Sequence, residues 1–596
     1  MKKTCLLIAL LWVLTLLPFW QCLQAPFVYW DDPYYLLDNL SVRDLSPSGI
    51  QRIFTDTVSG TYVPLSVLSF AVEFHFFGLT PFVYHLNNLL LHLAIVALVF
   101  FLGRRLDFGE QAAFVAALIF GIHPMHVEAV AWVTSRKDLL YTFFFLSSIL
   151  AYLRYIDRRA WRYYLLSLAA ALLSILAKPM ALTLPLALIL IDWFKGRLFT
   201  DRSIWDKLPL FLIVIPIAWL TYRLHARLPG TDLGSSVLTW IWCLTFYIRK
   251  FLWPYPCLAI YKIPENFSHV SFDLAVILFI LLIRLLIHVR KNRIWMFAFA
   301  FYFLNIFYLL RFDTSRDLQV VSDRYMYLAS VGFCLLFGIL FVRGTEFLRQ
   351  KSKSADKILI IISSLLMVGL GFLSFRQCQL WCDEPALWHH TVRHNPSGDA
   401  YQKLGDSYFM RDKDVQAQPF YEEALRLQPR NYQVMTNLAI IYAYKWRLNE
   451  AMRLTNQALS IKSDYAGAYL NRGVLFTRTG QFDQALADIS KAIELNPNRP
   501  IAYTNRGNIY TQMNRLDLAI RDYSQAIALD NLAFQAYYNR GLAYALLGDL
   551  KSAQRDFRET LRLNPNHGPA RNNLNVVLKH QARPRGEFED KNKKGK

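Results

Sequence analysis

The sequence lacks the usual signatures of soluble enzymes. It contains no Walker phosphate-binding loop, no glycine-rich dinucleotide fingerprint and no HExxH motif. Only seven cysteines occur among 596 residues, and they show no zinc spacing. Cys378 and Cys382 lie four residues apart on a predicted helix end, which is a poor geometry for a disulfide. These absences argue against a nucleotide-dependent soluble enzyme, a zinc-finger protein and a disulfide-stapled scaffold.

Charge is scarce over long stretches of the first part of the chain. The composition is 54% hydrophobic and 15% aromatic, and apolar runs alternate with short polar loops from Met1 to about Phe375. A soluble protein of this length would have a lower apolar content. From about Asp399 onward the sequence is charged and helical in pattern. The sequence therefore predicts a membrane domain followed by a soluble domain.

The net charge of +21 does not point to nucleic acid as a partner. Much of the Lys and Arg lies in loops between apolar runs, where the positive-inside rule accounts for it. Basic residues in such loops also suit anionic lipid headgroups. We therefore expect membrane lipid as a partner.

The charges of the loops orient the predicted spans. Lys2 and Lys3 precede the apolar run at residues 6–23, which places the N-terminus in the cytoplasm. This run has no clear small-residue cleavage site, so we expect a retained span. Assigning each cationic loop to the cytoplasm gives about eleven spans and leaves the soluble domain outside. Residues 63–78 and 235–254 are expected as interfacial or re-entrant helices.

Two adjacent carboxylates follow the first predicted span. In this topology Asp31 and Asp32 emerge on the non-cytoplasmic face at membrane height. Ionisable groups near hydrocarbon are costly, and those that are kept there are functional candidates. The alternative is an exposed loop with two solvated acids. Their position on the same side as the other outward loops favours a catalytic role.

Further candidates lie in the later outward segments. The second acidic loop carries His123, His126, Glu128 and Asp138, and candidate lipid-phosphate ligands are Arg249, Lys250 and Arg324. A carboxylate can remove the proton of an acceptor hydroxyl, while Arg or Lys stabilises a leaving phosphate. The alternatives are headgroup contacts for the bases and structural hydrogen bonds for the histidines. The spacing implies no metal site, and a divalent metal stays open as a cofactor.

The soluble part repeats itself every 34 residues. The triplet Asn-Arg-Gly recurs at Asn471, Asn505 and Asn539, and the same step reaches Asn437 backwards and Asn573 forwards. This period and its recurring small and aromatic residues resemble the tetratricopeptide repeat. Five repeats are predicted, and a capping helix is expected at about residues 569–579. The predicted repeat starts are Gly398, Tyr432, Ala466, Pro500 and Phe534.

The recurring asparagines suggest a peptide-binding groove. Such arrays form a superhelix with a concave face, and an amide can donate to a peptide C=O and accept from its N–H. Asn437, Asn471, Asn505, Asn539 and Asn573 resemble the asparagine ladder of tetratricopeptide proteins that hold extended peptides. The alternative is that these side chains brace neighbouring helices. A protein or peptide acceptor is the expected partner of this groove.

Four segments together resemble a known family. They are WDDPYYLLDN (residues 30–39), YVPLSVLSFAVEFHFFGLTPFVYHLNNLLLH (residues 62–92), HPMHVEAVAWVTSRKDLL (residues 123–140) and SDRYMYLAS (residues 322–330). With the repeats, they resemble the transmembrane and tetratricopeptide-repeat-containing proteins. This family belongs to the GT-C glycosyltransferase superfamily and is related to the protein O-mannosyltransferases.

The resemblance implies an all-α fold with a multipass GT-C-type membrane domain followed by a tetratricopeptide superhelix. The implied domains are a membrane glycosyltransferase domain at residues 1–376, a linker at 377–397, repeats at 398–582 and a disordered basic tail at 583–596. It implies a polyprenyl-phosphate-linked sugar as donor, Asp31 or Asp32 as base, with Asp31 slightly preferred, and Arg324 as a phosphate ligand. The first loop is shorter than in animal members, and Val63 stands where a basic residue is common.

Three functional hypotheses follow. The first is a glycosyltransferase that moves a sugar, such as mannose, from polyprenyl phosphate to Ser or Thr of exported proteins. The second is a non-enzymatic scaffold for envelope complexes, although a simple anchor needs one span and not about eleven. The third is a transferase acting on lipid-linked glycans. The short N-terminus and compact loops look bacterial, which predicts an inner-membrane protein with periplasmic repeats.

Overall fold

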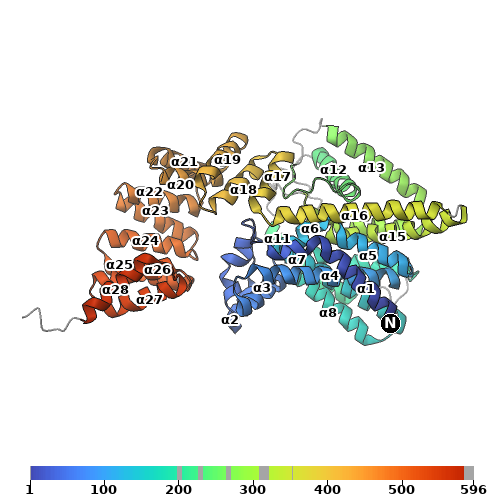
Figure 1. The fold of residues 1–596 in the computed structure, drawn as a ribbon, viewed down its shortest axis with the longest axis horizontal. Coiled ribbons are helices and arrows are strands. Elements are labelled where there is room, and N and C mark those ends of the chain that lie inside the picture. The colour runs from blue at the N-terminus through green and yellow to red at the C-terminus, as the bar shows by residue number, and fades with distance from the viewer. Residues whose placement is uncertain are drawn as a thin grey trace, which may run out of the picture. The chain divides into compact units, whose positions relative to one another are not determined.

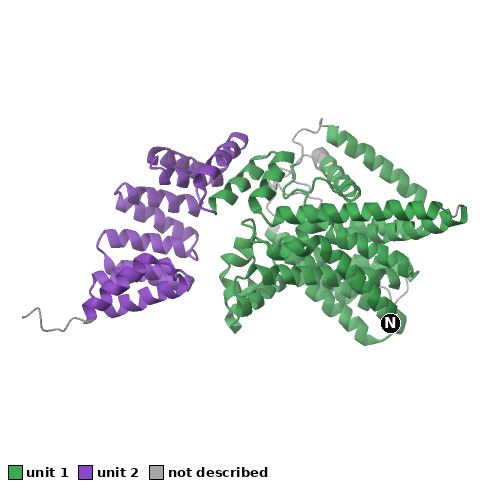
Figure 2. Ribbon diagram, in the orientation of Figure 1, with its two compact units in different colours: residues 1–410 green, residues 411–596 purple. Residues whose placement is uncertain are grey.

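The computed structural model describes residues 2–197, 205–225, 233–262, 270–307, 321–351 and 354–582. Within these residues the secondary structure is helical, with one isolated β-bridge between Val58 and Thr61. The predicted all-α fold is confirmed. The chain divides into two compact units, residues 1–410 and 411–596 (Figures 1 and 2). The predicted disordered tail lies outside the described residues.

The first unit holds the apolar helices. Their bounds are α1 (Lys2–Phe19), α2 (Pro47–Thr55), α3 (Pro64–Phe77), α4 (Pro81–Arg105), α5 (Glu110–Ile122), α6 (Val127–Ala131), α7 (Arg136–Arg158), α8 (Trp161–Ala177), α9 (Leu184–Phe194), α11 (Leu208–His225), α12 (Leu233–Leu252), α13 (Val270–Val289), α14 (Arg293–Ile306), α15 (Met326–Lys351), α16 (Ala355–Trp381), α17 (Glu384–His394) and α18 (Gly398–Phe409).

Several of these helices have the length and composition of membrane spans. In the described part of the chain, six helices are long and apolar enough to cross a bilayer, or seven if α5 and the bent segment Pro124–Ala131 form one span. Five shorter apolar helices accompany them: Pro64–Phe77, Trp161–Ala177, Pro179–Phe194, Leu208–Leu224 and Arg293–Ile306. The protein is therefore a membrane protein, and the predicted number of about eleven spans stays a prediction.

The spans pack closely where small residues meet. A Cβ at Gly338 of α15 would lie 2.3 Å from the carbonyl oxygen of Ala112 on α5. A Cβ at Gly332 would lie 2.6 Å from the carbonyl oxygen of Ala298 on α14. Both glycines thus permit backbone contact that any side chain would prevent. Close contact of this kind is the usual means by which helices associate in lipid, because burial of apolar surface gives no driving force there.

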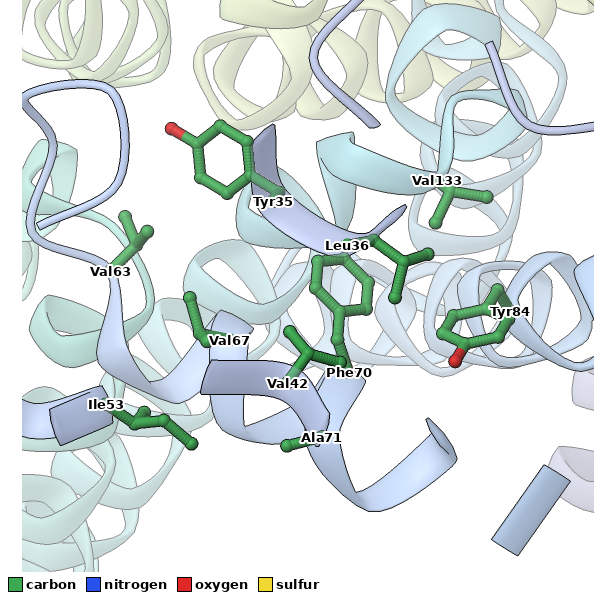
Figure 3. Packing of buried hydrophobic residues seen from close by; sticks show 10 residues of the cluster. All are labelled: Tyr35, Leu36, Val42, Ile53, Val63, Val67, Phe70, Ala71, Tyr84 and Val133. Atoms are coloured by element: carbon green, nitrogen blue, oxygen red, sulfur yellow. The ribbon is translucent and has the colours of Figure 1, made fainter. Parts of the chain in front are cut away.

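The loop between α1 and α3, predicted to be the first outward loop, is a folded substructure. It contains the short helices η2 (Pro33–Leu37) and η3 (Leu40–Arg43), followed by α2. Figure 3 shows how apolar side chains of this loop meet those of α3 and α4, together with Val133 of the second loop. The buried cluster comprises Tyr35, Leu36, Val42, Ile53, Val63, Val67, Phe70, Ala71, Tyr84 and Val133. The packing fixes the loop that carries Asp31 and Asp32 against the second loop.

The second unit is a stack of helix pairs. Its helices are α19 (Asp414–Leu427), α20 (Tyr432–Tyr444), α21 (Leu448–Ile461), α22 (Ala466–Arg478), α23 (Phe482–Leu495), α24 (Pro500–Gln512), α25 (Leu516–Leu529), α26 (Phe534–Leu546), α27 (Leu550–Leu563) and α28 (Gly568–Ala582). Each predicted repeat start coincides with the first residue of a helix, and α28 occupies the position predicted for the capping helix.

The Asn-Arg-Gly triplets have clear packing roles in this stack. A Cβ at Gly507 would lie 2.7 Å from the ring of Tyr523 on the next helix, and the other two triplet glycines are equally crowded. Arg506 forms an ion pair of 2.8 Å with Asp522, sixteen residues further on. The same pair recurs as Arg472–Asp488 and Arg540–Asp556. The triplet therefore joins the two helices in each of the three repeats that carry it.

Candidate functional site

Four tryptophans connect the two outward loops to the end of the membrane domain. The indole of Trp30 stacks on that of Trp132 with ring centres 4.5 Å apart. Trp132 also stacks on Trp381 at the end of α16, and Trp388 of α17 meets Trp30 edge-on at 5.3 Å. All four side chains are buried. This stack fixes the position of Asp31 and Asp32, the residues that follow Trp30.

Asp32 is fully buried and bonded on both carboxylate oxygens. Its Oδ2 accepts from the backbone N–H of Val28 at 2.8 Å. Its Oδ1 accepts from the backbone N–H of Thr134 at 3.2 Å and from the Thr134 hydroxyl. Burial raises the pKa of Asp32 to about 6, against the lowering effect of these hydrogen bonds. Asp32 therefore ties the first outward loop to the second.

Asp31 has a different environment. Its side chain is 31% exposed, and its Oδ2 lies 3.7 Å from Nζ of Lys137 at the start of α7. Lys137 is itself buried and sits over the ring of Tyr35 at 4.1 Å. Asp31 is thus a carboxylate that a substrate hydroxyl could reach, held beside a cation.

Asp138 and Glu128 form buried ion pairs beside this position. Lys178, between α8 and the short helix η6 (Pro179–Thr183), donates to Asp138 Oδ1 at 2.6 Å. The other oxygen of Asp138 has no hydrogen-bond partner within the described ranges. Glu128 accepts from the guanidinium and the backbone N–H of Arg324, and from the Ser322 hydroxyl at 2.9 Å.

The charged side chains of these loops form one group, here named the acid–base cluster. The guanidinium of Arg324 lies over the ring of Trp132 at 5.1 Å and over that of Trp30 at 5.8 Å, and so reaches the stack that carries Asp31. The cluster comprises Asp31, Glu128, Lys137, Asp138, Lys178 and Arg324. Three carboxylates and three cations thus converge from four segments far apart in the sequence.

The two histidines have structural partners on both ring nitrogens. His123 contacts the Phe251 carbonyl through Nε2 at 3.0 Å and accepts from the Met125 N–H through Nδ1. His126 contacts the Phe120 carbonyl at 2.7 Å and the Ser330 hydroxyl at 3.0 Å. This arrangement favours the structural alternative for both. Within the described residues no group of three metal-ligating side chains occurs.

Arg249 and Lys250 lie at the end of α12 on the wall of a cavity of about 260 Å³, here named the cationic pocket. Lys262 and His394 also line it. Lys250 donates to the Pro256 carbonyl and lies over the ring of Tyr261 at 4.9 Å. The Tyr261 hydroxyl donates to Asp323 at 2.8 Å, and Asp323 directly precedes Arg324 in the chain. The cationic pocket therefore adjoins the acid–base cluster.

An apolar groove of about 430 Å³ begins at the same place. Arg249 and Trp253 line both this groove and the cationic pocket. The rest of its lining is almost entirely apolar and comes from α12, α13, α14 and α15, with Leu278, Leu285, Phe299 and Phe337 among the side chains. The cationic pocket thus opens into the apolar groove.

Sequence reasoning missed Lys178, Tyr261 and Lys262. Lys178 carried a signal that could have found it, because it is a single charge between two apolar runs on the predicted outward side. Tyr261 and Lys262 lie in an irregular segment with no periodicity, so only the fold brings them to the pocket.

The asparagine series is largely engaged within the array. The amide nitrogen of Asn471 donates to the Thr436 carbonyl at 3.3 Å, and that of Asn539 to Asn508 at 2.8 Å. Asn437 and Asn573 donate to the hydroxyls of Tyr421 and Tyr538. These bonds support the bracing alternative for the amide nitrogens. The peptide-groove role of Asn437, Asn471, Asn505, Asn539 and Asn573 stays a prediction.

Comparison with known protein families finds matches in both units. The dolichyl-phosphate-mannose-protein mannosyltransferase family matches residues 64–222. Tetratricopeptide repeat families match residues 466–499, 489–521, 507–548 and 534–567. The two kinds of match occur in the order that the sequence pattern predicts, with the membrane domain first.

Curated relatives match parts of this chain of different length. Human protein O-mannosyl-transferase TMTC1 is 24% identical over 500 residues, covering 71% of this chain and 55% of the relative. Human TMTC3 is 24% identical over 572 residues, covering 77% and 60%. Drosophila melanogaster Tmtc1 is 34% identical over 190 residues, covering 30% and 22%. The chain spans about three-fifths of the length of the two human relatives.

Solved structures of tetratricopeptide proteins match a part of this chain. A tetratricopeptide protein of Thermus thermophilus is 21% identical, covers 30% of this chain and 99% of its own, and has a TM-score of 0.28. The families and the curated relatives together confirm the expected resemblance. This chain matches a mannosyltransferase family in its membrane domain and tetratricopeptide families in its repeats, and it is similar to the TMTC protein O-mannosyl-transferases.

Proposed function

We propose that this protein transfers a sugar, such as mannose, from a polyprenyl-phosphate donor to Ser or Thr hydroxyls of exported proteins. The observation that carries the proposal is the junction of three features within the first unit. A partly exposed carboxylate, Asp31, lies in a buried acid–base cluster, and this cluster adjoins a cationic pocket that opens into an apolar groove.

Asp31 acts as the base in this proposal. Its exposure lets an acceptor hydroxyl approach, and removal of the hydroxyl proton makes the oxygen a better nucleophile as it attacks the sugar. Asp32 is enclosed by Val28 and Thr134 and serves as a positioning residue. The preference between the two acids thus rests on their accessibility.

The donor occupies the cationic pocket and the groove. Arg249, Lys250 and Lys262 present positive charge to the phosphate, which must leave with the bond electrons as the sugar moves. The isoprenoid chain lies along the groove, whose lining suits hydrocarbon. Arg324 is held by its ion pair with Glu128. In this proposal its guanidinium stabilises negative charge that develops on the phosphate, between the cationic pocket and Asp31.

The repeats present the acceptor in this proposal. Tetratricopeptide arrays commonly hold extended peptides on their concave face, and the carboxamide groups of the asparagine series line up at intervals of one repeat. A location in a bacterial inner membrane with periplasmic repeats belongs to the same proposal. It follows from the loop charges and places acceptor and catalytic loops on one side.

A transfer assay tests the proposal. Full-length protein is given a polyprenyl-phosphate mannose donor and a Ser/Thr-rich peptide, and the product is identified by mass spectrometry. We expect Asp31→Asn to lower the rate by about 10²-fold or more, as general-base loss does. Asp56→Asn, at an exposed position of the same outward loop, is the control and should retain full activity.

The competing hypotheses have distinct outcomes in the same experiments. Full activity of Asp31→Asn contradicts its assignment as the base. Sugar found on lipid-linked glycan and not on peptide favours the third hypothesis. A deletion strain with unchanged glycoproteins and glycolipids and a lost envelope complex favours the scaffold. A rate unchanged by chelation would show that the reaction needs no divalent metal.

A further inference from the structure

A second charged cavity lies at the other end of the membrane domain. It has a volume of about 610 Å³ and is lined by the C-terminal parts of α4 and α7, by α8 and by the residue after α9. Asp157 in its wall and Asp138 in the acid–base cluster are both on α7. At 1.5 Å per residue they are roughly 28 Å apart along the helix, about the thickness of the bilayer core.

The charge balance of this cavity is positive. Arg104, Arg105, Arg154 and Lys195 line it, against two carboxylates, Asp107 and Asp157. Each carboxylate is engaged by one cation, since Lys195 pairs with Asp107 at 2.7 Å and Arg105 pairs with Asp157 at 2.9 Å. Two cations therefore exceed the available carboxylates in the wall.

Arg104 and Arg154 are the two excess cations. Arg104 donates to the Thr4 hydroxyl at 3.1 Å and lies near the ring of Phe100. Arg154 is exposed and lies over the ring of Tyr163 at 6.0 Å. In the part of the chain that the structure describes, neither forms an ion pair with a carboxylate. Both guanidinium groups retain N–H donors for an anion.

The lining of the cavity also includes apolar side chains, two of which are exposed. They include Leu98 and Phe101 of α4, Leu150 of α7 and Leu166 of α8. Phe101 is 37% exposed and Leu166 is 56% exposed. A ligand in this cavity therefore meets both positive charge and apolar side chains.

We infer that this cavity binds an anionic phospholipid of the membrane. The phosphate lies between Arg104 and Arg154, and the acyl chains run along Leu98 and Leu166 into the bilayer. Basic pockets between spans on the cytoplasmic side suit such headgroups, and the loop charges predict that this end faces the cytoplasm. The apolar lining would not stabilise a free phosphate ion, which has no acyl chains to bury. The site is independent of the proposed transfer reaction.

Native mass spectrometry of the full-length protein tests this inference. The protein in detergent is titrated with phosphatidylglycerol and, separately, with phosphatidylcholine of the same acyl chains. We expect preferential retention of phosphatidylglycerol. The double variant Arg104→Gln/Arg154→Gln should bind it about 25-fold more weakly, at about fivefold for each cation removed, with phosphatidylcholine binding unchanged.

Matched variants separate this site from general surface charge. Arg158→Gln/Arg162→Gln removes two exposed cations nearby that do not line the cavity, and should leave retention unchanged. Asp157→Asn removes a carboxylate and should strengthen phosphatidylglycerol binding. This expected gain in binding keeps the inference testable if the double variant fails to fold. High salt should weaken binding.

Several outcomes would overturn the inference. Equal retention of phosphatidylcholine and phosphatidylglycerol would do so, as would unchanged binding in the Arg104→Gln/Arg154→Gln variant. Equally tight binding of soluble glycerol phosphate would identify a site for free phosphate and remove the lipid. A rise in melting temperature with phosphatidylglycerol, absent in the double variant, would support the inference by a second measurement.

Discussion

Two adjacent aspartates differ in this protein because of what covers them. Asp31 keeps 31% of its side chain exposed beside Lys137, whereas Asp32 is enclosed and bonded to Val28 and Thr134. Because they are adjacent in the sequence, both residues were candidates for the catalytic base. The fold turns one outward as a reachable carboxylate and the other inward as a tie between loops.

The raised pKa of Asp32 predicts a pH-dependent stability. Folded protein holds the Asp32 proton up to about pH 6, whereas the unfolded chain releases it near pH 4. Stability from this group is therefore greatest below pH 4 and is lost as the pH rises to 6, by about 3 kcal/mol. We expect the melting temperature of wild type relative to Asp32→Asn to fall across this range.

The control for this prediction is Asp56→Asn, which changes a solvated carboxylate in the same loop. Its melting temperature should follow that of wild type at every pH. The melting temperature of wild type minus that of Asp32→Asn is the quantity to follow. A value that stays constant from pH 4 to 7, or that rises with pH, would contradict the buried-proton explanation.

Individual helices in the first unit depend on close backbone contact. Gly338→Ala would place a methyl group 2.3 Å from the Ala112 carbonyl, so α15 and α5 must separate. Overpacking of this kind costs about 1–3 kcal/mol, and we expect a clearly lower melting temperature in detergent. Differential scanning fluorimetry of the purified full-length protein measures it.

Gly369→Ala is the matched control, because nothing lies within 4 Å of the added Cβ on α16. The same substitution there should leave stability unchanged or raise it, since alanine restricts the unfolded chain. Equal effects of the two substitutions would show that helix propensity, and not the α15–α5 contact, determines the outcome.

The repeat helices show which element-level features a sequence can reveal. A strict period of 34 residues predicted the first residue of the first helix in each repeat, because a repeat is one structural unit whose crowded positions must recur. In the same triplets, Gly507 and Arg506 are explained by packing and by the Asp522 ion pair, whereas the groove role of the asparagines stays a prediction. Recurrence alone does not distinguish a brace from a binding site.

At the scale of the whole molecule, the loop charges predict the side on which the repeats lie. An alkaline phosphatase fused after Ala582 should be active, because this reporter requires export. A cytoplasmic fluorescent reporter at the same position should stay dark. The control fusion after Arg105 should give the reverse result, since this end of α4 is predicted to face the cytoplasm. An inactive phosphatase fusion together with a fluorescent reporter fusion after Ala582 would contradict the peptide-acceptor proposal.

The sequence by itself determined the division into membrane and repeat domains, the all-α class and the repeat phase. Each of these is a composition or a period, and composition and period follow from local sequence. It also singled out Asp31, Glu128, Asp138 and Arg324, because charges are costly near hydrocarbon and are rarely kept there without a role.

Only the tertiary structure decided how these charges pair. Lys178 meets Asp138 although 40 residues separate them, and Arg324 meets Glu128 although 196 do. The same packing engages both nitrogens of His123 and joins the cationic pocket to an apolar groove at Arg249 and Trp253. Such partnerships depend on how distant helices pack, and no local pattern in the chain records that.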